Sequence, residues 1–88
     1  MHTWLVTITG APVSRSQGWQ VRYSFRQAGF TIREHFDDRS GLSPARWFWV
    51  DHSTGGAITL WLLQRLPVLE RSVLDPRQAV SLEEIDLG

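Results

Sequence analysis

The sequence predicts a small α+β domain: an antiparallel meander of four or five strands, with a short helical region near the C-terminus. Three observations support this fold class. Residues 3–9 are mostly β-branched or aromatic, residues 19–36 carry apolar side chains at alternate positions, and residues 67–74 begin with a proline and have helical apolar spacing. With 88 residues, the chain has the length of a single domain, residues 1–88.

The clearest pattern is the alternation of apolar and polar side chains in residues 19–36. It runs over residues 19–26, pauses at residues 27–29 and resumes over residues 30–36. Because successive side chains of a strand point to opposite faces, the pattern predicts an antiparallel hairpin. The core side of this hairpin is expected to hold Trp19, Val21, Tyr23 and Phe25, and the outer side Arg22, Arg26, Arg33 and His35. Glu34 falls on the apolar side, so we expect a bulge to turn it outward or an Arg to pair with it.

Two segments of the second half carry apolar side chains on both alternating faces. Residues 46–50 predict a strand, whereas residues 57–66 fit either a strand or a helix; we favour a strand paired with residues 46–51. Residues 80–87 are expected to form a last strand; alternatively, residues 75–88 form a loosely held acidic tail. Because one short helix covers only one face of a sheet, the apolar excess predicts a second chain, either a copy of this one or another protein.

The composition excludes several classes of site. The chain has no Cys, Lys or Asn, and nine Arg carry its positive charge. Disulfides, thiol nucleophiles, zinc–thiolate centres and Schiff-base or P-loop lysines are therefore excluded. Codon bias in a GC-rich bacterial genome accounts for the all-Arg usage, and selection for the guanidinium group is the alternative. With no apolar run of membrane length and no basic segment of a signal peptide, we expect a cytoplasmic protein.

The formal net charge of zero conceals an uneven distribution along the chain. Residues 1–50 hold six Arg and three acidic residues, whereas residues 51–88 hold three Arg and six acidic residues. A basic half and an acidic half can dock within one chain or between two chains. Zero net charge also leaves no long-range repulsion between copies.

Three short patterns contain residue types used in catalysis or ligand binding. Asp51, His52 and Ser53 are consecutive, but neighbouring strand positions point to opposite faces, so we expect no catalytic triad. Residues 54–57 could hold an anion if they opened a helix, but they lack the glycine spacing of a phosphate loop. The three histidines, which lack the spacing of metal ligands, are His2, His35 and His52. We predict no catalytic residue, no metal and no cofactor.

The sequence therefore predicts a small non-catalytic protein-interaction module of the accessory, adaptor or inhibitor type, carried by a bacterial genome or its mobile elements. It would present an aromatic and Arg surface on a β-sheet and self-associate, most simply as a homodimer, with no membrane partner. The expected partner-binding residues are Arg22, Arg26, Arg33, Trp47, Trp49 and Trp61. The alternative is a nucleic-acid-binding module whose Arg stripe on the 19–36 hairpin follows the phosphate backbone.

Overall fold

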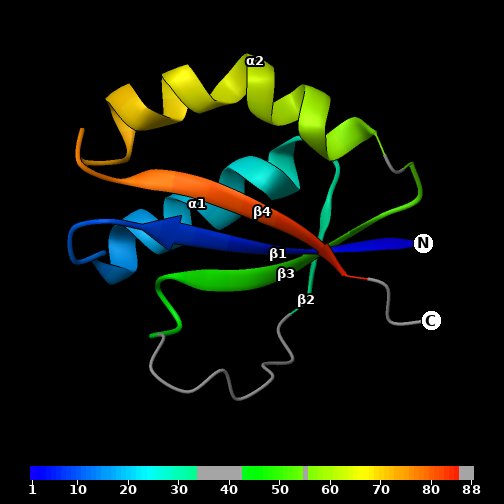
Figure 1. Ribbon diagram of the computed structural model, residues 1–88, viewed down its shortest axis with the longest axis horizontal. Coiled ribbons are helices and arrows are strands. Elements are labelled where there is room, and N and C mark those ends of the chain that lie inside the picture. The colour runs from blue at the N-terminus through cyan, green and yellow to red at the C-terminus, as the bar shows by residue number, and fades with distance from the viewer. Residues whose placement is uncertain (34–42, 55, 86–88) are drawn as a thin grey trace.

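The computed structural model describes residues 1–33, 43–54 and 56–85. The elements, in chain order, are β1 (His2–Thr9), α1 (Arg15–Gln27), β2 (Thr31–Arg33), β3 (Trp47–His52), α2 (Ala57–Ser72) and β4 (Ala79–Ile85) (Figure 1). The predicted α+β class and the antiparallel sheet of four strands are confirmed.

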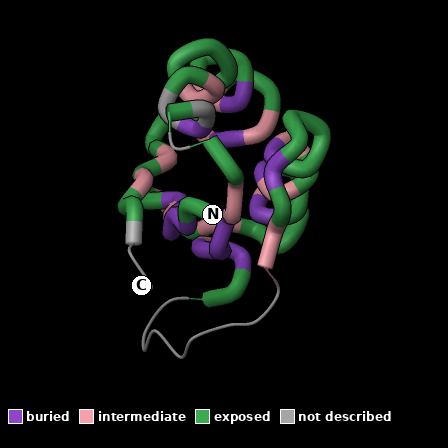
Figure 2. The backbone as a smooth tube through the Cα atoms, turned by 90° about the vertical axis from the view of Figure 1, so that its right-hand side faces the viewer, coloured by how far each residue is buried: buried purple, intermediate pink, exposed green. Residues whose placement is uncertain are grey.

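The path of the chain through the sheet differs from the expected meander. The strands lie in the order β2-β3-β1-β4, so α1 connects two strands that flank β3, and α2 connects two strands that flank β1. Two interlocked split β-α-β units of this kind form the ferredoxin-like arrangement. Both helices pack on the same face of the sheet, and Figure 2 shows the exposed residues on their outer sides.

The central strand β1 is buried on both faces, which explains its nearly continuous apolar run. Trp4, Val6 and Ile8 belong to the main core beneath the helices. Leu5 points to the opposite face, where it packs in a smaller cluster with two Trp side chains of β3. Strands β3 and β4 pair with β1 along most of its length, so the N-terminal strand lies next to the C-terminal one.

Strand β3 also buries both of its faces within the one chain. Phe48 and Val50 are fully buried in the main core, and Trp47 and Trp49 are only 3% and 5% exposed in the smaller cluster. The two Trp rings meet edge to face, with centroids 6.5 Å apart. The apolar side chains of residues 46–50 thus need no second chain to cover them, contrary to the expectation that one chain covers only one face of this segment.

The alternation in residues 19–26 lies on a helix, so the predicted hairpin is wrong. The helix begins after Ser14, whose hydroxyl accepts a hydrogen bond from the Gln17 backbone N–H at 3.1 Å. In return, the Gln17 side chain accepts a hydrogen bond from the Ser14 backbone N–H at 2.9 Å. This capping box satisfies two backbone donors at the helix start and favours helix over strand.

The helix divides the alternating apolar residues between two opposite sides. Val21 and Phe25 lie one turn apart and are fully buried. Trp19 and Tyr23, also one turn apart and expected in the core, are 57% and 51% exposed. The prediction that all four face the core is therefore wrong for Trp19 and Tyr23.

Of the second predicted hairpin strand, residues 30–36, the structure describes residues 30–33. Thr31–Arg33 form β2, which pairs with β3 rather than with residues 19–26. Glu34 and His35, for which the sequence made specific predictions, lie outside the described residues.

Residues 57–66 belong to a helix, so the favoured strand is wrong there too. Helix α2 runs from Ala57 to Ser72 and continues through Pro67, which was expected to open a helix. Its Leu, Gln and Arg residues are good helix formers. Ile58 and Leu69, which lie about three turns apart on this helix, are buried.

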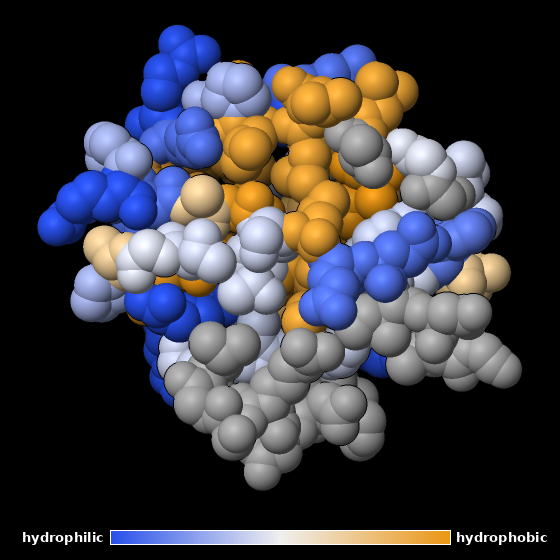
Figure 3. Space-filling model, viewed as in Figure 1, coloured by the Kyte–Doolittle hydropathy of each residue, from blue (hydrophilic) through white to orange (hydrophobic). Residues whose placement is uncertain are grey.

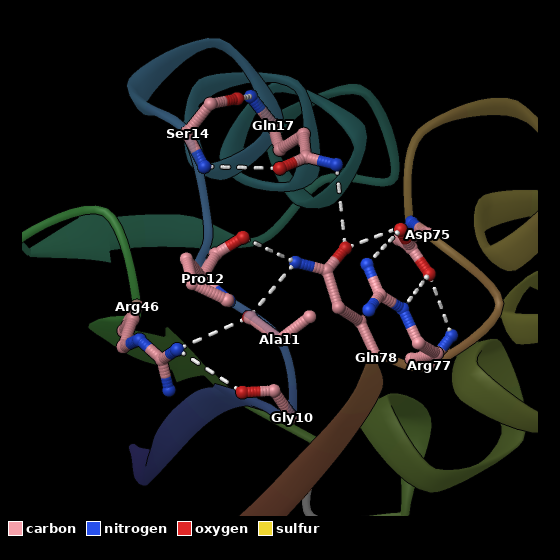
Figure 4. A network of polar contacts seen from close by, with 9 residues as sticks. All are labelled: Gly10, Ala11, Pro12, Ser14, Gln17, Arg46, Asp75, Arg77 and Gln78. Atoms are coloured by element: carbon pink, nitrogen blue, oxygen red, sulfur yellow. Dashed lines mark hydrogen bonds and ion pairs between the residues drawn. The ribbon is translucent and has the colours of Figure 1, made fainter.

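A buried amide joins three segments near one end of the sheet (Figure 4). Gln78 is 3% exposed, and its Nε2 donates hydrogen bonds to the carbonyl oxygens of Ala11 and Pro12 at 3.2 and 3.1 Å. Its Oε1 accepts from the Asp75 backbone N–H at 2.8 Å and from Gln17 Nε2 at 3.3 Å. The side chain thereby ties the loop after β1 and the first turn of α1 to the turn before β4.

Candidate protein-interaction surface

The exposed large apolar side chains of the described residues gather on the two helices. Apart from Met1, all of them lie on α1 or α2: Trp19, Tyr23, Leu60, Leu63 and Val68. Figure 3 shows apolar side chains gathered around α2, at the top of the view. Single exposed apolar residues are common on protein surfaces, but several on one layer of a small domain are typical of a binding surface.

On α1, an aromatic pair and positive charge share the outward side. The Trp19 and Tyr23 rings stack with centroids 6.3 Å apart, and the Arg26 guanidinium lies 5.7 Å from the centre of the Trp19 ring. The helix contains three Arg and no acidic residue. Trp, Tyr and Arg are the side chains most enriched at binding hot spots.

Helix α2 adds exposed aliphatic side chains and further positive charge. Leu60 and Leu63 are 58% and 74% exposed. Together the two helices, which we call the helical layer, contain five Arg and one acidic residue, Glu70. The other acidic residues in the described part of the chain lie in the sheet and its turns: Asp51, Asp75, Glu83 and Glu84. The helical layer is therefore both apolar and basic.

A groove with a volume of about 420 Å³ lies between α1 and α2. Its apolar lining includes Trp61, whose ring packs 4.2 Å from the Phe25 ring, and the buried Leu69. Among its described lining residues, only Arg65 carries a charge. The Arg65 side chain is exposed and makes no hydrogen bond or ion pair with the described residues.

A second hollow, of about 410 Å³, lies on the other side of α1, where Arg22 has a structural role. The Arg22 guanidinium donates hydrogen bonds to the carbonyl oxygen of Pro44 and, at 3.0 Å, to that of Trp47. It also lies 5.2 Å from the centre of the Phe48 ring. These contacts hold the start of β3 against α1, so Arg22 is half-buried rather than fully outward as expected.

The structure does not bring together the three Arg residues of the predicted stripe. Arg33 lies on β2, not on α1, and its guanidinium binds the Asp51 carboxylate through Nε at 3.1 Å and Nη2 at 2.8 Å. The Thr3 hydroxyl donates to the same carboxylate at 2.6 Å. Arg22 and Arg26 remain together on α1, but the hairpin stripe proposed for nucleic-acid binding does not form.

Of the three Trp residues expected to bind a partner, Trp47 and Trp49 are buried and Trp61 is half-buried in the groove. Leu60 and Leu63 were not among the expected binding residues, because a strand over residues 57–66 has no single outward side. Helical spacing would have placed Leu60 and Leu63 on the side opposite Ile58 and Leu69.

Asp51 and His52 lie on opposite faces of β3. Asp51 pairs with Arg33, whereas the His52 ring packs 4.7 Å from the Phe30 ring and its Nδ1 accepts a hydrogen bond from the Thr54 backbone N–H at 3.0 Å. Within the part of the chain that the structure describes, no three His, Asp or Glu side chains are grouped so that they could hold a metal ion.

Comparison of the chain with protein-family models, with curated proteins and with solved structures gave no match. Over residues 1–33, 43–54 and 56–85, neither helix combines the length and the hydropathy that crossing a membrane requires.

Proposed function

We propose that the chain is a small protein-interaction module that binds its partner through the helical layer. The observation that supports this proposal is the concentration of exposed Trp, Tyr, Leu and Val side chains on α1 and α2, beside five Arg and a single acidic residue. A matching partner offers an apolar surface bordered by carboxylates. The docking surface is thus moved from the sheet, where the sequence suggested it, to the helices.

The size of the apolar contribution indicates a moderate affinity. Covering a large apolar side chain contributes roughly 1.5–3 kcal/mol, and Trp19, Leu60 and Leu63 are each more than half exposed. Association itself costs roughly 4–15 kcal/mol. The apolar contacts of these three side chains are therefore comparable in size with that cost, so the net affinity depends on the remaining contacts of the layer, and Arg–carboxylate pairs at the rim add orientation and specificity.

A second copy of the chain is one partner with suitable chemistry. Strand β4 carries Glu83 and Glu84, both exposed, and contains no Arg. It can therefore supply carboxylates to the helical layer of another copy. This arrangement retains the self-association expected from the sequence but places its apolar contacts on α2 and not on β3.

Co-purification from cells of the source organism tests the proposal when it is done with matched variants. We would compare the tagged wild-type chain with a Leu60→Ser and Leu63→Ser double variant, and with a Gln20→Ser and Gln64→Ser control at exposed polar positions. Circular dichroism would verify that each variant folds. Proteins that the wild type and the control retain, and that the Leu variant loses, are the expected result. Equal retention by all three chains would contradict the proposal.

Salt dependence separates protein binding from the nucleic-acid alternative. Nucleic-acid binding weakens steeply with salt because phosphate counterions are released. An interface dominated by Trp19, Leu60 and Leu63 is expected to respond only weakly. A partner that is lost after nuclease treatment, or whose affinity falls by more than about a hundredfold between 50 and 200 mM salt, would favour the alternative.

A further inference from the structure

We infer that the groove between α1 and α2 binds a carboxylate-bearing apolar peptide segment, with Arg65 as the group that pairs with the carboxylate. This inference rests on the proposed function, because it assigns one part of the helical layer to one part of the partner. It commits to a segment of another protein and gives its chemistry: apolar side chains together with Glu, Asp or a terminal carboxylate.

The groove has the dimensions and the lining of a binding pocket. Its volume of about 420 Å³ lies within the range of roughly 300–1,000 Å³ that is typical of such pockets. Trp61 and Leu69 supply apolar surface, and Val68, which is 49% exposed, lies at its edge. Packing of the Trp61 ring against Phe25 and Phe30, with centroids 4.2 and 5.9 Å apart, holds this wall in place.

The polar groups around the groove favour an anion. Arg65, Tyr23 and Gln27 all line it, and none of their side chains hydrogen bonds to another side chain among the described residues. No acidic residue is present among the described lining residues. A carboxylate can accept two parallel hydrogen bonds from a guanidinium, and can take further bonds from a hydroxyl or an amide.

The number of charges argues for a peptide over a nucleic acid at this position. Nucleic-acid backbones present regularly spaced phosphates and are bound by several cations together. Here a single Arg faces apolar side chains, an arrangement that suits one carboxylate on an otherwise apolar segment. The excess of Arg over the whole helical layer, five against one acidic residue, favours the approach of an acidic segment.

Arg71 on the same helix offers a matched control. Its Nε donates to the carbonyl oxygen of Pro67 at 3.2 Å, it is exposed like Arg65, and it is not part of the groove lining. Both Arg65→Gln and Arg71→Gln remove one exposed positive charge from α2, so neither substitution is expected to shift the midpoint of urea unfolding appreciably. A difference between them reports on the groove and not on the net charge.

The test uses the 15N-labelled full chain and a 12-residue capped helical peptide of Leu, Ala and Glu. Its two comparison ligands are the same peptide with Lys in place of Glu, and decanoate. We expect the Glu peptide to shift the backbone signals of Tyr23 and Gln27 and the Trp61 indole signal. Arg65→Gln should weaken its binding by at least about fivefold. Arg71→Gln should change it by less than about twofold, since Arg71 is exposed and does not line the groove.

Several outcomes would overturn the inference. These are equal binding of the Lys peptide, shifts confined to the sheet, equal effects of Arg65→Gln and Arg71→Gln, and binding of decanoate without binding of the Glu peptide. If the groove fails while the Leu60→Ser and Leu63→Ser variant still loses its partners, only this inference is wrong. If that variant keeps every partner, the proposed function is wrong whatever the peptides do.

Discussion

Replacing Gln78 with Ala removes all four side-chain hydrogen bonds of the buried amide at once. Its two donors face the carbonyl oxygens of Ala11 and Pro12, and its oxygen accepts from the Asp75 backbone N–H and from Gln17 Nε2. No other side chain in the described residues connects the same three segments. The substitution therefore measures how much a single polar group contributes to holding the β1–α1 loop against the turn before β4.

The expected loss in the free energy of unfolding is about 3–4 kcal/mol. A typical intramolecular hydrogen bond contributes about 1 kcal/mol net, and four are lost. Groups that stay buried without a partner add to the loss, whereas water entering the space left by Gln78 reduces it. Because a domain of this size has a total stability of roughly 5–15 kcal/mol, the change is large enough to measure by urea unfolding.

The Gln78→Glu substitution tests the orientation of the amide. It keeps an acceptor for Asp75 and Gln17 but places a second oxygen about 3 Å from the carbonyl oxygens of Ala11 and Pro12. Burial and these oxygens raise the pKa of the introduced carboxyl above its usual range. Below about pH 4 the group is protonated in both the folded and the unfolded chain, so no ionisation penalty exists. As the pH rises above that value, the unfolded chain releases the proton more readily and the folded state loses stability.

The assay is urea unfolding followed by circular dichroism at pH 4 and pH 7, with Gln20→Ala as the control. The exposed Gln20 side chain makes one long hydrogen bond, to Ser16 at 3.5 Å, so this control should lose less than about 0.5 kcal/mol. A loss below about 1 kcal/mol for Gln78→Ala, or a Gln78→Glu variant whose stability relative to the wild type does not fall between pH 4 and pH 7, would refute the reasoning.

Three other predictions follow from the structure. Gly18→Ala should lower the free energy of unfolding in urea by more than about 2 kcal/mol, because a Cβ at this position meets the backbone just before β3. Gly56→Ala is the control: a Cβ there meets no other atom, so the free energy of unfolding should change by less than about 0.5 kcal/mol. Hydrogen bonds from Arg77 lower the pKa of Asp75 to about 2. The stability that this pair adds is therefore present above the ordinary pKa of 3.8 and is lost as the pH falls toward 2. In an NMR titration, Arg77→Gln should raise the pKa of Asp75 toward its ordinary value. Sedimentation should show self-association at tens of micromolar that Leu63→Ser weakens, and a wild-type chain that remains monomeric there would contradict the self-association.

The first strand could be predicted because its local pattern suits one secondary structure only. Residues 3–9 are mostly β-branched or aromatic and could be assigned to a strand, which is β1 in the structure. The strand order could not be predicted, because it depends on which distant segments pair. Residues 80–87 gave a weak strand signal, yet Ala79–Ile85 pair with β1 along most of its length and help bury it.

The errors in the helices have a common physical cause. Short apolar segments fit either secondary structure, and the start of a helix is marked by its cap more than by its apolar pattern. Ser14 and Gln17 show the spacing of a capping box in the sequence, and this signal outweighs the alternation that follows. Residues 57–66 contain no such cap, and Gly56, the N-cap of α2, has no side chain that could form a capping hydrogen bond. The helix there is stabilised by packing on the sheet, a long-range effect.

The alternation in residues 19–26 becomes informative once it is placed on a helix. Apolar residues at every second position of a strand share one face, so all can be buried. On a helix, positions 21 and 25 share one side and positions 19 and 23 share another, so the sheet can bury only one pair. Trp19 and Tyr23 are the pair left outside, stacked on each other beside Arg26. An alternating aromatic segment that begins with a capping box therefore predicts a helix with a second apolar side, and that side is the one we propose binds the partner.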